Sequence, residues 1–207
     1  MKIDLLGGSY EAKYKELNSQ KTINWYPVLS TTDEKDKSTT QLYPTPGLTT
    51  WVTLPGRYIR ALYSPRTPDQ NRCFAIIDTT LYEIFLNQSY VNRGSVANCA
   101  QGTTRIYMEA NSADQLFICN YNAAYIFNLS TNTLTAMTNA TYFGHADSLT
   151  YLDGYHVITS GGQVQFSQPN QADNWPGTNT YRPTFKADPC IAVTALRETI
   201  LNFLKGR

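Results

Sequence analysis

Short apolar runs alternate with polar turns over most of this chain. From Arg57 onward, runs of four to seven residues that are rich in aromatic and β-branched side chains are separated by turn residues, and no long stretch has the period of a helix. Such side chains suit the pleated, half-buried surface of a sheet. The pattern predicts an all-β fold for residues 57–207.

Four segments share one order of strand, short polar turn and strand, which is the pattern of a β-hairpin. They cover Cys73–Leu86, Leu116–Leu129, Tyr155–Ser167 and Ile191–Leu204. Their second strands are expected to begin near Leu81, Ala124, Val164 and Ile200, at intervals of 43, 40 and 36 residues.

These intervals resemble the repeat of a β-propeller, in which one four-stranded blade takes roughly 40 to 50 residues. We therefore expect a partial β-propeller over residues 57–207, with about three blades and the start of a fourth. A β-sandwich is the alternative, because regularly spaced hairpins also occur there. Closed propellers have at least four blades, and the chain ends at Arg207 directly after an apolar strand. We expect the blades to belong to a longer product or to be completed by neighbouring subunits.

Residues 1–56 differ from the rest in being polar and punctuated by proline. Proline fixes φ and removes a donor from the hydrogen-bond ladder, so this segment is predicted to be an extended N-terminal arm with short strands. Its aromatic and proline side chains combine large apolar faces with a restricted backbone, which lowers the entropy cost of docking. We expect them to contact the chain's own propeller or a neighbouring subunit. These candidate subunit-contact residues are Trp25, Tyr26, Pro27, Tyr43, Pro44, Pro46 and Trp51.

The amino-acid composition argues against several classes of function. The chain has 207 residues, of which 13% are aromatic and only 16% are charged, and its net charge is +1. A dedicated nucleic-acid binder needs a basic surplus to neutralise phosphates. The arginines and tyrosines between Arg57 and Arg72 are residue types that bind phosphates and stack on bases, but a locally basic loop is the simpler interpretation. No window approaches the roughly 20 apolar residues of a membrane helix, so no membrane partner is expected.

Cofactor and metal chemistry find little support in the sequence. The four cysteines form no CxxC pair, which argues against a structural zinc site, and Cys73 and Cys119 lie in apolar runs that favour a core position. No glycine-rich phosphate loop is present. His145 and His156 are the available histidine bases for a hydrolase, and both are better interpreted as turn or surface residues. We expect no cofactor, no metal and no enzymatic activity.

A resemblance rests on short motifs in a fixed order. The motifs are Ile23–Pro27, Leu42–Leu48, Tyr58–Tyr63, Leu81–Ile84, Leu149–Tyr155, Gln165–Gln168, Asn174–Trp175 and Ala195–Leu204. In this order the chain resembles the podoviral packaged-DNA stabilization protein family. The resemblance spans nearly the whole chain, although members of that family are considerably longer.

The resemblance implies a structural virion protein that contains a β-propeller and acts as a tail hub or head-completion component. It implies a homo-oligomeric ring below the portal and head-to-tail adaptor proteins, which retains packaged DNA without sequence specificity and carries distal tail needle or tailspike proteins. Assembly in the host cytoplasm would precede a place in the virion tail. The family has no catalytic residues to carry over. The rival interpretation is a propeller carbohydrate-binding or glycan-processing protein, with exposed Tyr and Trp as sugar platforms.

Overall fold

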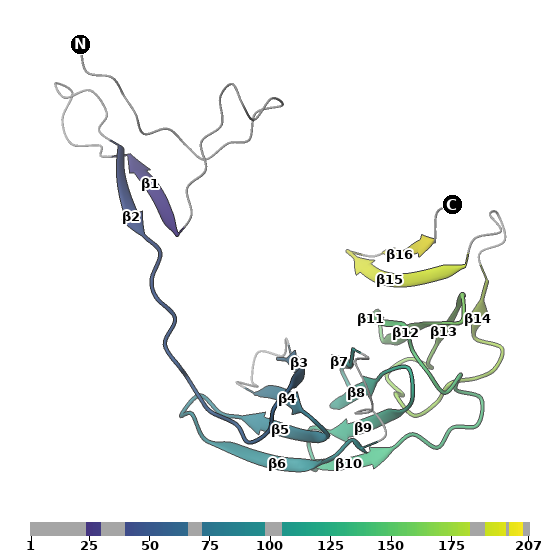
Figure 1. Ribbon diagram of the computed structural model, residues 1–207. Helices are drawn as coiled ribbons and strands as arrows, with labels where there is room; N and C mark the ends of the chain where they lie inside the picture. The colour runs from purple at the N-terminus through teal and green to yellow at the C-terminus, as the bar shows by residue number, and fades with distance from the viewer. Residues whose placement is uncertain are drawn as a thin grey trace. The chain divides into compact units, whose positions relative to one another are not determined.

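The computed structural model describes residues 24–29, 40–65, 72–97, 105–182, 189–197 and 199–204. The chain divides into two compact units, Met1–Thr50 and Trp51–Arg207. In the first unit, β1 (Trp25–Leu29) pairs antiparallel with β2 (Thr40–Pro44) (Figure 1). The arm boundary at residue 56 stays a prediction.

The described part of the second unit consists of antiparallel sheets whose strands are ordered as in the chain (Figure 1). The first sheet contains β3 (Ile59–Tyr63), β4 (Cys73–Ile77), β5 (Thr80–Ile84) and β6 (Tyr90–Ser95). The second contains β7 (Tyr107–Ala110), β8 (Gln115–Cys119), β9 (Ala124–Asn128) and β10 (Thr133–Ala136). The third contains β11 (Ser148–Leu152), β12 (Tyr155–Ser160), β13 (Gln163–Phe166) and β14 (Thr180–Tyr181).

A two-stranded sheet of β15 (Cys190–Leu196) and β16 (Thr199–Leu204) follows. The predicted all-β fold is confirmed, and the sheets are those of a partial β-propeller that does not close. No helix within the described ranges is long and apolar enough to cross a membrane.

The fourth predicted hairpin was aligned wrongly with the other three. The first three hairpins are the second and third strands of their sheets, whereas β15 and β16 are the first and second strands of the next sheet. The second strands β4, β8, β12 and β16 begin at Cys73, Gln115, Tyr155 and Thr199, at intervals of 42, 40 and 44 residues. The short interval of 36 came from comparing different strands, because every neighbouring pair in such a sheet has the same pattern of strand, turn and strand.

The first strands of successive sheets, β3, β7, β11 and β15, lie next to one another. Side-chain oxygens bridge them: the Tyr63 hydroxyl accepts a hydrogen bond from the Ala110 N–H at 2.9 Å. The Ser148 hydroxyl accepts one from the Val193 N–H at 2.9 Å, and the Thr150 hydroxyl one from the Ala195 N–H at 3.0 Å. These four strands are therefore the inner strands of the blades.

The apolar core lies between the sheets, and β8 shows why. Leu116 and Ile118 pack into the cluster shared with the first sheet, whereas Phe117 and Cys119 pack into the cluster shared with the third. Successive strand residues point to opposite faces, so a strand buried on both faces has a continuous apolar run. The core position predicted for Cys119 is confirmed, and Cys73 is half-buried. Cys99 lies outside the described residues.

The segment before β3 closes over the face of the first sheet that points away from the second. Val52 and Leu54 pack against a cluster that includes Ile77, and the Asp78 carboxylate accepts hydrogen bonds from the Arg57 and Tyr58 N–H groups at 2.9 and 3.0 Å. Gly56 has a φ of 126°, and a Cβ there would lie 2.3 Å from the Ile77 Cγ2 atom. Glycine is required for this approach.

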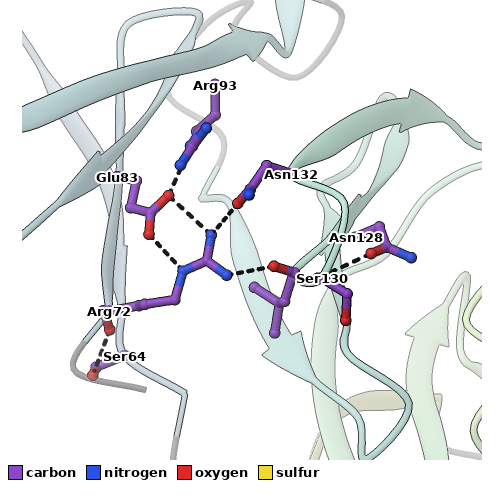
Figure 2. Close-up of polar contacts among 8 residues, drawn as sticks. Ser64, Arg72, Glu83, Arg93, Asn128, Ser130 and Asn132 are labelled. Atoms are coloured by element: carbon purple, nitrogen blue, oxygen red, sulfur yellow. Dashed lines mark hydrogen bonds and ion pairs between the residues drawn. The ribbon is translucent and has the colours of Figure 1, made fainter. Parts of the chain in front are cut away.

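An ion-pair network joins the first sheet to the second (Figure 2). Glu83 on β5 is only 1% exposed, and the Arg72 guanidinium donates to its two oxygens at 2.5 and 2.9 Å. Arg93 Nε donates to Glu83 Oε2 at 2.7 Å. Burial alone would raise the pKa of Glu83, but the hydrogen bonds and charges of the two arginines hold that pKa below its usual value.

Arg72 also reaches the loop between β9 and β10. Its Nη1 donates to the Leu129 carbonyl at 2.6 Å and its Nη2 to Asn132 Oδ1 at 2.5 Å. The guanidinium carbon lies 5.2 Å from the centre of the Phe74 ring and 5.9 Å from that of Phe127. One arginine therefore holds two blades in register.

We predict that Arg72→Met lowers the free energy of unfolding by about 3–5 kcal/mol, because it leaves the buried Glu83 carboxylate undercompensated. Arg72→Lys should lose less, since it keeps the charge but not the planar fork. Urea unfolding measures both. Arg57→Met is the control, because the Arg57 side chain is exposed. Equal stabilities of the Arg72→Met and Arg57→Met proteins would contradict a linking role for the network.

Candidate functional site

Five of the seven candidate contact residues lie together on the β1–β2 sheet. Trp25 is opposite Pro44, Tyr26 is opposite Tyr43, and Pro27 is opposite Leu42. The rings of Tyr26 and Tyr43 stack with their centres 6.1 Å apart. Trp25, Tyr26 and Tyr43 are 50%, 47% and 45% exposed. Directly opposed residues share a face and neighbouring pairs alternate, so this sheet presents aromatic surface on both faces.

The other two candidates lie elsewhere. Pro46 is exposed in the stretch after β2. Trp51 begins the second unit and is exposed, next to the Val52 and Leu54 side chains that cover the first sheet. The role of all seven residues in subunit contact stays a prediction.

His156 is a core residue and not a surface base, so the expectation of a turn or surface position was wrong for it. Its side chain is fully buried on β12, with ring centres 5.3 Å from Phe117 and 5.2 Å from Tyr151. Its Nε2 lies 3.1 Å from the Glu109 carbonyl, and within the described structure its Nδ1 has no partner. Burial lowers the pKa of His156 to about 4, although the bond to Glu109 acts in the opposite direction.

His145 lies in the loop before β11, as expected. Its Nε2 is 2.7 Å from the Ser160 hydroxyl, and Ser160 is almost fully buried. The Asp147 carboxylate, which the sequence placed two residues away, accepts a hydrogen bond from the Gly161 N–H at 3.2 Å. His145 therefore holds the β12–β13 turn in place.

The arginine cluster is divided by the fold. Arg72 is committed to Glu83 and the second sheet, Arg57 is exposed and Arg60 is half-buried. Arg66 lies outside the described residues. In the same described part of the chain, no group of three or more His, Cys, Asp or Glu is placed to hold a metal ion.

A cavity of about 620 Å³ lies between the four inner strands at one of their ends, and both polar and apolar residues line it. The lining residues are Leu62, Tyr63, Ser64, Pro65, Glu109, Ala110, Asn111, Ser112, Thr150, Tyr151, Thr194 and Ala195. Sequence reasoning missed this cavity. A signal was present in the hydroxyls that alternate in Ser148-Leu149-Thr150, which serve the β15 backbone.

Comparison with known proteins identifies the family. Residues 1–205 match the family described as Bacteriophage P22 Gp10, beta-propeller. The chain belongs to this family. The resemblance drawn from the motifs is confirmed, and the P22 Gp10 family has a propeller and not the alternative sandwich. The family supports a structural virion protein that stabilises packaged phage DNA.

Two solved structures illustrate what this P22 Gp10-family chain is similar to. PorZ, a surface component of the type IX secretion system of Porphyromonas gingivalis, has a TM-score of 0.52 at 8% identity, over 87% of this chain and 23% of PorZ. U3-55K has a TM-score of 0.49 at 15% identity, over 70% of this chain and 45% of that one. This chain spans less than half the length of either structure. The likeness to PorZ shows the fold alone. No curated protein matches the sequence.

The lowered pKa of His156 predicts how the stability of this P22 Gp10-family protein depends on pH. Its folded pKa of about 4 lies below the usual value of about 6.5. The unfolded chain therefore binds the proton first, and stability is lost as the pH falls from about 6.5 towards 4. Between pH 7 and pH 4.5 this group should remove about 2 kcal/mol from the free energy of unfolding.

Urea unfolding at the two pH values of wild type and of His156→Phe measures this loss. The phenylalanine variant should lack that part of the pH dependence, while His145→Gln should retain it. An equal loss of stability on acidification in wild type and His156→Phe would refute the role of His156.

Proposed function

We propose that this P22 Gp10-family protein is a non-enzymatic tail hub or head-completion component. It binds below the portal and adaptor proteins, retains packaged DNA and carries the distal tail needle or tailspike proteins in the virion tail. The observation that carries the proposal is the family match over residues 1–205. Such a role needs stable protein contacts and no chemistry at a catalytic centre.

The β1–β2 sheet is the proposed contact between subunits. Tryptophan and tyrosine are enriched among the residues that dominate binding energy at interfaces, and Trp25, Tyr26 and Tyr43 expose about half of their surface. Paired strands and prolines already restrict the backbone, so less entropy is lost on docking. Pro27, Pro44, Pro46 and Trp51 complete the proposed contact set.

Packaged DNA would pass through the centre of a ring of subunits and not along the axis of one propeller. The inner strands of adjacent sheets lie within hydrogen-bonding distance, as in the 2.9 Å contact from the Val193 N–H to the Ser148 hydroxyl. The cavity between the four inner strands measures about 620 Å³, which leaves no room for a double helix. A ring that encloses the DNA needs no base contacts, which agrees with retention without sequence specificity.

Native mass spectrometry of the purified protein, alone and with portal and adaptor proteins, tests the proposal. Wild type should form a discrete homo-oligomeric ring or join those partners. Trp25→Ser should weaken this assembly at least tenfold, because it removes a large apolar contact. Tyr181→Ser is the matched control, since Tyr181 is an exposed aromatic residue outside the proposed contact set.

A wild-type protein that stays monomeric and ignores both partners would overturn the hub assignment. If the Trp25→Ser protein assembles normally, the hub assignment stands, but the proposal that the β1–β2 sheet is the subunit contact fails.

A further inference from the structure

A second, smaller pocket lies at the start of β7 and β11, at the end of these strands opposite the 620 Å³ cavity. Its volume is about 170 Å³, and its lining comes from the start of β7, the β8–β9 turn and the residues before β11. The lining residues are Arg105, Tyr107, Tyr121, Ala146 and Asp147. Neither the family nor the proposed hub role gives this pocket a function.

Tyr121 gives the pocket an exposed aromatic wall. It lies in the β8–β9 turn, and 56% of its surface is exposed. The centres of the Tyr121 and His145 rings are 4.9 Å apart. His145 is in turn fixed by a hydrogen bond between its Nε2 and the Ser160 hydroxyl, at 2.7 Å. The wall is therefore held in place before any ligand arrives, which lowers the entropy cost of binding.

Two opposite charges flank this wall. The Arg105 guanidinium carbon lies 5.6 Å from the centre of the Tyr107 ring. Asp147 is anchored by the Gly161 N–H at 3.2 Å and by the Tyr107 hydroxyl, which donates to its carbonyl at 2.5 Å. The ion pairs found within the described ranges involve neither Arg105 nor Asp147. Both groups keep hydrogen-bonding capacity for a ligand.

The charges select the class of ligand. An anion such as a phosphate would meet the Asp147 carboxylate, and a cation would meet the Arg105 guanidinium. A neutral polyol satisfies both groups, because its hydroxyls donate to a carboxylate and accept from a guanidinium. The C–H face of a sugar ring also packs on an aromatic face, as other apolar groups do.

We propose that the pocket of Arg105, Tyr107, Tyr121 and Asp147 binds one neutral pyranose unit, the end of a glycan chain. The volume fits this size, because pockets for larger, drug-sized ligands measure roughly 300–1,000 Å³. The binding chemistry considered for the rival carbohydrate-binding interpretation is thus present in a P22 Gp10-family protein. The site needs a single chain and no ring of subunits, so it stands or falls independently of the hub assignment.

A glycan array with neutral and charged glycans tests the proposal. Titration calorimetry then measures the affinity for the same glycans, free in solution, that bind the protein on the array. Wild type should retain neutral pyranose-terminated glycans. Tyr121→Ala and Tyr121→Leu should each weaken binding at least tenfold, the latter because it keeps apolar volume but not the aromatic face. Asp147→Asn should also weaken binding, since an amide accepts fewer hydrogen bonds than a carboxylate.

Tyr58→Ala is the matched control, because Tyr58 is an exposed tyrosine outside the pocket, and this variant should bind as wild type does. Thermal unfolding of every variant separates lost binding from lost folding. The proposal fails if wild type retains no neutral glycan, or if folded Tyr121→Ala and Tyr121→Leu bind as wild type does. It also fails if a double-stranded DNA oligonucleotide is bound instead and Asp147→Asn strengthens that binding.

Discussion

Burial of sheets on both faces is the constraint on which this structure depends. Neighbouring blades cover the second sheet on each side, so the strand Gln115–Cys119 alternates between two separate cores and no polar position interrupts its apolar run. The first sheet meets the second on one face, and the lead-in residues Val52 and Leu54 cover the other. The sheets therefore stabilise one another, and a single blade taken alone would expose a large apolar area.

The same constraint decides where polar side chains can lie. Most polar groups between two sheets have a partner, often one from the neighbouring blade, and His156 Nδ1 is an exception within the described residues. Glu83 has the two arginines. Gln165, fully buried on β13, accepts from the Phe143 N–H at 3.0 Å and donates to the Thr141 carbonyl at 2.7 Å. Apolar surfaces can pack together in many relative positions, whereas these hydrogen bonds form only when the two sheets are in one relative position. These polar groups therefore favour one arrangement of the blades over others.

Hairpins could be predicted from sequence because both strands and their turn are contiguous, as in Cys73–Leu86. The sequence could not show which two strands of a blade a given hairpin represents, because all hairpins in a meander look alike. The Ile191–Leu204 pair was misaligned for this reason. The aromatic candidates of the arm were visible in the sequence, but the pairing of Tyr26 with Tyr43 depends on strand register. Pockets are harder still: Arg105, Tyr121 and Asp147 come from three separate elements, and no local pattern brings them together. His156 shows the opposite problem: a turn or surface position was expected for it, whereas packing between Phe117 and Tyr151 buries it.

The hydroxyls of Ser148 and Thr150 have a consequence for solubility. An inner strand such as β15 presents backbone donors at the edge of its sheet, and such an edge is a template on which strands of other molecules can add and form aggregates. The side chains of β11 occupy the Val193 and Ala195 donors of β15, and the Tyr63 hydroxyl occupies the Ala110 donor of β7, so the inner edges of the second and fourth sheets are blocked by the preceding sheet. This protection comes from side chains of the same chain, so it needs no second molecule to cover the edge.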